Sequence, residues 1–211
     1  KKVMIWDLNS SNETPAISEE LQFQITSMIL TPNEEKLIIG CSKIEDDFNA
    51  KPVNFHTNSD YAYIHDAKTL KKLTSFQKNT DIQTLCLYKS GECLISGSSD
   101  RSIYFWNLEN YSSSKTLLGH SNKIISEIMS SDASKLILGC DDKSIVVWDL
   151  SSAKLNTIFE GHSGKPTCLA IKSDSKKLVS GSDDKSIKIW CMINKREITQ
   201  LQGHSSAVTC L

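Results

Sequence analysis

The chain has 211 residues, of which 39% are hydrophobic and 23% charged, so it is long enough to bury a sizeable core. Its formal net charge is −1 and its Lys and Arg residues are scattered, which argues against a nucleic-acid-binding protein. Because no apolar run approaches the roughly 18 residues that span a bilayer, and no signal peptide is visible, we expect no membrane insertion.

Short apolar runs, rich in β-branched residues and separated by polar turns, predict β-strands along the whole chain. In chain order the predicted strands cover 2–6, a segment before 25, 25–30, 36–41, 61–65, 70–76, 82–88, 93–98, 102–106, 115–118, 124–129, 135–140, 144–148, 155–159, 166–171, 177–182, 186–190, 197–201 and a last strand from 207. Runs such as Ile145–Trp148 are apolar without alternation, which indicates sheets that are covered on both faces.

A block of about 42 residues repeats along the chain, and two markers keep the same step. The first marker is a Trp-Asp pair or a variant of it, centred on Trp6, His65, Trp106, Trp148 and Trp190, with spacings of 59, 41, 42 and 42 residues. The second is Gly-His, at 119–120, 161–162 and 203–204. A period of roughly 40–45 residues with these markers is typical of a β-propeller with four strands per blade.

The predicted fold is therefore all-β, a propeller of four-stranded antiparallel blades forming one domain over residues 1–211. The strands begin and end in the middle of a blade, so we expect an incomplete ring of about five blades, part of a seven-bladed propeller. A closed five-bladed ring is the alternative. Residues 42–60 form a polar insertion that we interpret as either a mobile loop or a partner-binding arm.

Residues 93–107, 135–149 and 177–191 share one pattern, and with Gly-His before it the motif reads GH…SGSxD…IW. This pattern resembles the WD-repeat family of propellers along essentially the whole chain. The resemblance implies a structural hydrogen-bonded tetrad of His, Ser, Asp and Trp within each blade. We number the blades in chain order and count the incomplete one that starts at 2–6 as blade one. The matching residues are His162, Ser180, Asp184 and Trp190 in blade five, His120, Asp142 and Trp148 in blade four, and Ser96, Asp100 and Trp106 in blade three. Blade four has Leu138 in place of the Ser, and blade three has Lys78 in place of the His.

The same residue types, Ser180, His162 and Asp184, would suit a hydrolase triad. We favour the structural interpretation because the three residues recur in phase with the repeat and no exposed G-x-S-x-G elbow is present. No clustered metal ligands and no phosphate-binding Gly-rich loop occur, so no catalytic, metal or cofactor site is predicted. The seven Cys include no C-x-x-C pair and are interpreted as reduced structural thiols.

In WD-repeat proteins, partners often dock on the face that carries the connections between the second and third strands of each blade and between blades. The positions that the family uses there map onto Asp81, Gln83, Ser99, Lys123, Ile125, Asp141, Lys165, Thr167 and Asp183. None is aromatic, which argues against a cation-binding aromatic cage. Their mixed charge favours a protein or peptide partner.

The sequence thus predicts a non-enzymatic scaffold that holds protein partners in a larger assembly. The alternative is a propeller appended to a catalytic or signalling domain, such as a kinase, a ubiquitin ligase or a GTPase-linked protein, as its recognition part. The reduced cysteines predict an intracellular protein of the cytoplasm, with nucleus and cilium as the other compartments.

Overall fold

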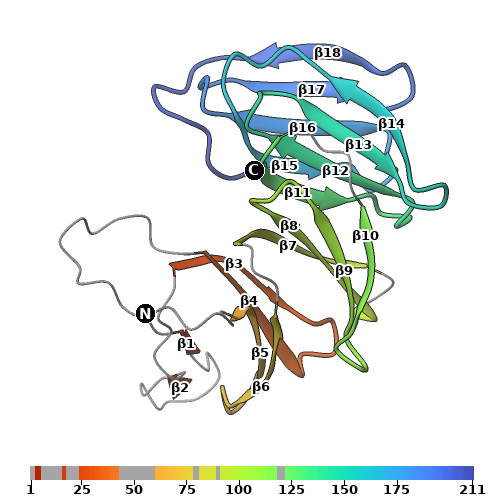
Figure 1. Ribbon diagram of the computed structural model, residues 1–211. Coiled ribbons are helices and arrows are strands. Elements are labelled where there is room, and N and C mark those ends of the chain that lie inside the picture. The colour runs from red at the N-terminus through yellow and green to blue at the C-terminus, as the bar shows by residue number, and fades with distance from the viewer. Residues whose placement is uncertain are drawn as a thin grey trace.

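The computed structural model describes residues 3–5, 16–17, 24–42, 60–77, 81–88, 91–117 and 122–211. Four antiparallel sheets of four strands each make up most of it (Figure 1). Blade two contains β3 (Gln24–Leu30), β4 (Lys36–Ser42), β5 (Asp60–Asp66) and β6 (Lys72–Gln77), and blade three contains β7 (Ile82–Tyr88), β8 (Cys93–Ser98), β9 (Ile103–Asn107) and β10 (Ser113–Leu117). Blade four contains β11 (Ile124–Met129), β12 (Lys135–Cys140), β13 (Ile145–Asp149) and β14 (Lys154–Phe159), and blade five contains β15 (Pro166–Ile171), β16 (Lys177–Ser182), β17 (Ile187–Cys191) and β18 (Arg196–Leu201).

The strands of each blade follow one another in space as they do in the sequence, so every blade is a simple antiparallel meander. The first strands, β3, β7, β11 and β15, contact one another from blade to blade and form the inner side of the assembly. The blades are arranged in an arc that is not closed in the described part of the chain (Figure 1). This is the expected partial propeller, and it differs from the closed five-bladed alternative.

The predicted strands of blades two to five agree with the structure to within two residues at each end. Near the N-terminus, β1 (Met4–Ile5) and β2 (Ala16–Ile17) pair antiparallel, where the sequence predicts a strand over 2–6 and another before 25. The prediction of a strand from 207 is wrong, because residues 207–211 are not in a strand. Val208 instead makes isolated hydrogen bonds with blade five: its backbone N–H donates to Ser182 O, and its carbonyl accepts from the Thr167 hydroxyl.

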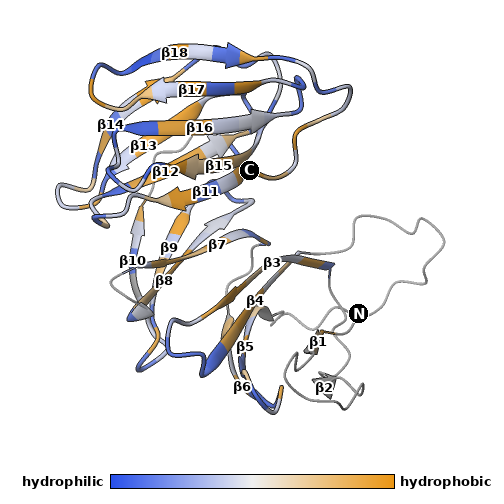
Figure 2. Ribbon diagram, turned by 180° about the vertical axis from the view of Figure 1, so that it is seen from behind, coloured by the Kyte–Doolittle hydropathy of each residue, from blue (hydrophilic) through white to orange (hydrophobic). Residues whose placement is uncertain are grey.

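The core consists of separate apolar clusters between neighbouring blades, and strand β12 shows how one strand supplies two of them. Leu136 and Leu138 point into the cluster shared with blade three, while Ile137, between them, points into the cluster shared with blade five. Successive side chains of a strand lie on opposite faces, so a strand buried on both faces needs apolar residues at every position. The apolar stretches accordingly lie within the strands, and the turns are mostly polar (Figure 2).

At the rim, Trp106 and Trp190 each contact an aromatic residue of the last strand of the preceding blade. Trp106 stacks on Phe76 with ring centroids 4.3 Å apart, and Trp190 lies 5.2 Å from Phe159. In blade four, Trp148 belongs to the same apolar cluster as Leu117, which lies in the last strand of blade three and takes the place of the aromatic residue. The repeated Trp therefore contributes to the contact between blades as well as to its own sheet.

Candidate functional site

The four tetrad residues of blade five form one continuous hydrogen-bonded chain. Trp190 Nε1 donates to Ser180 Oγ at 2.8 Å, His162 Nε2 lies 2.7 Å from the same oxygen, and His162 Nδ1 lies 2.8 Å from Asp184 Oδ2. Ser180 pairs with Lys188 across β16 and β17, which places the side chains of Ser180 and Trp190 diagonally on one face. His162 comes from the connection before β15, and Asp184 from the turn after β16.

The electrostatics of the tetrad assign a direction to each hydrogen bond. Burial lowers the pKa of His162, against the opposing influence of Asp184, so the ring is neutral near pH 7. Burial alone would raise the pKa of Asp184, but hydrogen bonds from Ser186, His162 and Ser163 hold it well below its usual range. His Nδ1–H therefore donates to the carboxylate, Nε2 accepts from the Ser180 hydroxyl, and Ser180 accepts from the indole.

This arrangement is unsuited to nucleophilic catalysis. Ser180 has no solvent-exposed surface and Trp190 is 1% exposed, so a substrate has no path to the hydroxyl. The Ser180 oxygen already accepts the indole N–H, and its proton is directed at His162. A triad serine instead needs an exposed oxygen that can approach a carbonyl carbon.

In blade three, part of the tetrad persists, and its Asp has a different partner. Trp106 Nε1 donates to Ser96 Oγ at 2.9 Å, as in blade five. Asp100 Oδ2 accepts a 2.6 Å hydrogen bond from the Tyr104 hydroxyl. Lys78, at the position of the missing His, lies outside the described residues. Tyr104 was not predicted as a site residue. The signal for it in the sequence is a tyrosine two residues before the repeated Trp.

In blade four, the tetrad positions hold a different network. Asp142 accepts a hydrogen bond from Asn122 Nδ2 and two from the amide and hydroxyl of Ser144. Leu138, at the serine position, is fully buried, and Trp148 is 7% exposed in the cluster with blade three. His120 lies outside the described residues. Here the turn carboxylate organises its own loop and the preceding connection.

The predicted partner-binding positions come together at one edge of blades three to five. The amide of the turn residue donates to the carbonyl of the residue before the first strand in each blade, at 3.0 Å every time. The pairs are Ser99 with Asp81, Asp141 with Lys123, and Asp183 with Lys165. In blade four the Asp141 carboxylate also accepts from the Lys123 amide at 3.1 Å. Two of the three positions per blade are thus fixed side by side by the backbone.

The third position in each blade is the extra residue of a β-bulge in the first strand. Register shifts fall at Gln83, Ile125 and Thr167, between the residues that pair with the second strand. The bulge in blade five turns the Thr167 hydroxyl onto the carbonyl of Val208, which lies beyond the blade. All nine predicted residues are partly or fully exposed, with Lys165 and Asp183 the most open. They define what we call the turn face. The insertion, which we predict to flank it, lies outside the described residues except at its ends.

Comparison with known families agrees with these features. The family "WD domain, G-beta repeat" matches residues 69–107, 111–149 and 153–191, which together make up more than half of the chain. The chain belongs to the WD-repeat family. Each matched segment contributes the last strand of one blade and the first three of the next, so the WD repeats interlock neighbouring blades. No curated protein matches the chain.

WD-repeat domains are generally interaction modules that bind proteins or peptides and lack enzymatic activity. The described residues of this chain contain no group of three or more His, Cys, Asp or Glu placed to hold a metal ion. The seven cysteines are free thiols, and burial raises the pKa of Cys41 to about 11 and of Cys140 to about 12. In the same part of the chain, no helix is long and apolar enough to cross a membrane.

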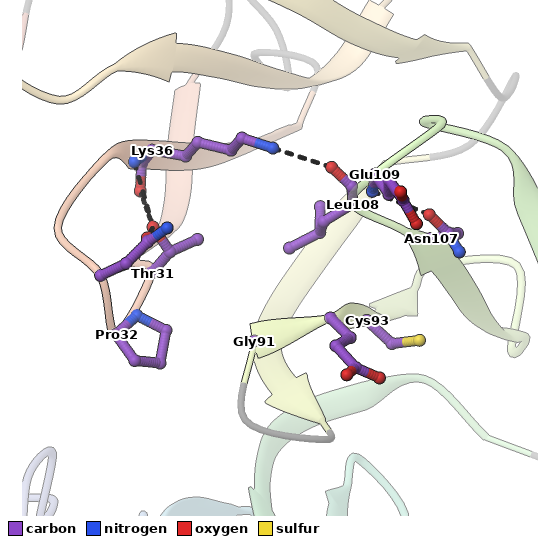
Figure 3. A pocket seen from close by; sticks show the side chains of 10 residues that line it. Thr31, Pro32, Lys36, Gly91, Cys93, Asn107, Leu108 and Glu109 are labelled. Atoms are coloured by element: carbon purple, nitrogen blue, oxygen red, sulfur yellow. Dashed lines mark hydrogen bonds between the residues drawn. The ribbon is translucent and has the colours of Figure 1, made fainter.

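A hollow of about 700 Å³ lies at the opposite edge of the WD blades, between blades two and three (Figure 3). The turns after β3, β7 and β9 line it, and Lys36 Nζ spans it to the carbonyl of Leu108 at 2.8 Å. Lys36 also lies 5.0 Å from the centre of the Tyr111 ring. These contacts hold the blades together at this edge, so we assign the hollow a structural role.

Proposed function

We propose that this WD-repeat chain is a non-enzymatic scaffold that holds a protein partner on the turn face of blades three to five. The observation that supports the proposal is that the nine family positions lie at one edge, all at least partly exposed, with six of them joined in pairs by backbone hydrogen bonds. Loops held by a rigid scaffold are where binding residues concentrate. The burial of Ser180 supports the absence of a catalytic role for its tetrad.

Charge indicates the kind of partner. Lys165 and Asp183 are exposed neighbours of opposite sign, and Lys123 and Asp141 form a second, half-buried pair of opposite sign one blade away. A peptide or loop with alternating charges could pair with both, which would fix its register across the two blades. A phosphate backbone would instead require an excess of Lys and Arg. We therefore propose a charged peptide or protein loop as the ligand.

The partner belongs to a larger assembly in this proposal, and the free cysteines support an intracellular location. A propeller that serves as the recognition part of a catalytic or signalling protein would use the same face. The proteins that co-purify with the full-length protein distinguish these two roles.

The test is a pull-down from cells with the variant Lys123→Glu, Lys165→Glu, Asp183→Lys. We expect it to fold normally and to lose at least one partner. A matched control, Lys154→Glu, Lys176→Glu, Glu92→Lys, makes the same charge changes at exposed positions of the opposite edge and should keep all partners. If the first variant keeps every partner, or the control loses the same ones, the turn face is not the contact surface.

A further inference from the structure

Glu127 is a carboxylic acid at a position that the other blades fill with an apolar residue. It lies on β11, opposite Leu138 of β12. The register of the first strands places Met28, Leu85 and Leu169 at the same position in blades two, three and five. Leu85 packs into the cluster between its own blade and the preceding one, so Glu127 is directed at blade three.

The carboxyl group of Glu127 is buried between the blades. Part of the residue remains exposed, but neither carboxylate oxygen has accessible surface, and neither forms a hydrogen bond of normal geometry with the described residues. The hydroxyl of Thr84, on β7, is likewise buried without a hydrogen bond of normal geometry in the described part of the chain. An ionised carboxylate in such a place is strongly destabilised, whereas the neutral acid is destabilised far less.

Among the described residues, no cation acts on the pKa of the carboxyl group. Cys86 of β7 is the titratable residue that faces it, and the pKa of this thiol is raised by burial and by the charge of Glu127. The neighbouring strands β12 and β15 hold three further titratable residues. Lys135 and Cys140 lie at the two ends of β12. Cys168 of β15 interacts with Cys210 rather than with Glu127. Burial raises the pKa of Glu127 to about 8, while the Thr84 hydroxyl acts weakly in the other direction.

We propose that Glu127 is a proton-dependent latch between blades three and four. The neutral acid lies in the interface and keeps the blades packed. When Glu127 loses its proton, the carboxylate requires hydration, and the interface opens locally around Thr84 and Cys86. The contact between these two blades therefore loosens as the pH rises through the mildly alkaline range.

Cys86 provides the readout, since its thiol is buried beside Glu127. We would measure the alkylation rate of Cys86 by iodoacetamide in the full-length protein from pH 6 to pH 9, using peptide mass spectrometry. Dividing by the rate of Cys41, which is buried on blade two, removes the intrinsic pH dependence of thiol reactivity. For a group that titrates near 4.5 in the open state and near 8 in the closed state, the ratio should rise on the order of a hundredfold.

The variant Glu127→Gln keeps the shape and cannot ionise, so its ratio should stay constant within about threefold over the same range. Glu160→Gln, which alters an exposed glutamate of the β14–β15 connection, should keep the full rise. If Glu127→Gln does not fold, Glu127→Leu restores the residue of the neighbouring blades and should also remove the rise. A constant ratio in the natural protein, or an equal rise in either Glu127 variant, would overturn the proposal.

Discussion

Replacing Ser180 by Ala tests whether the tetrad of blade five acts as one structural unit. The hydroxyl is the shared partner of Trp190 Nε1 and His162 Nε2, and both side chains are almost completely buried. A buried polar group left without a partner costs about 1–3 kcal/mol. With two such groups, we expect Ser180→Ala to lower the free energy of unfolding by about 2–4 kcal/mol.

Ser96→Ala in blade three is the matched control. Ser96 is equally buried, but among the described residues its hydroxyl bonds only Trp106 Nε1, so the expected loss is about 1–2 kcal/mol. Urea unfolding of the full-length protein, followed by tryptophan fluorescence, measures both variants. At a slope of about 2–3 kcal/mol per molar, Ser180→Ala should lower the midpoint by about 1 M. A loss no greater than that of Ser96→Ala would refute the shared role of Ser180.

Three further changes probe blade five, each by urea or acid unfolding. Trp190→Ala should cost about 3–5 kcal/mol, because it empties the contact with Phe159 as well as breaking the tetrad; a loss below about 1 kcal/mol would contradict this packing. Asp184→Ala should cost about 1–3 kcal/mol near neutral pH. Since the pKa of Asp184 is depressed, the stabilisation that this residue provides is present above about pH 4 and is lost as the pH falls further. The free energy of unfolding of the variant should therefore depend less on pH in acid than that of the natural protein. Lys185→Gly should gain about 0.5–1 kcal/mol, because Lys185 has a φ of 69°, a left-handed conformation that glycine adopts without a Cβ clash; a loss would mean that the Lys185 side chain contributes contacts of its own.

The strands and blades could be predicted from the sequence because the signal is repeated. The Gly-His and Trp-Asp markers keep one period, and each polar turn separates two apolar runs whose length suits a strand. The strand predicted from 207 was wrong because the apolar pattern of residues 207–211 matches a first strand, whereas strand formation depends on pairing with a neighbouring strand.

The site could be predicted only where blade five follows the full pattern. In the other blades the turn carboxylates bond Tyr104 and Asn122, and neither residue belongs to the motif. Such replacements depend on which side chains reach the carboxylate in space, and a motif does not contain that information. Glu127 could not be recognised either, because a glutamate in a strand is as compatible with an exposed face as with a buried interface.

The central claim, that partners bind at the turn face, is tested most directly by site-specific crosslinking in cells. A photo-crosslinking amino acid would replace Lys165 or Asp183 on the turn face, and Glu92 or Lys176 at the opposite edge, in the full-length protein. All four side chains are exposed, so each tolerates the replacement. We predict covalent adducts with the same protein partner from Lys165 and Asp183 and none from the opposite edge. Adducts formed only from Glu92 and Lys176 would contradict the account.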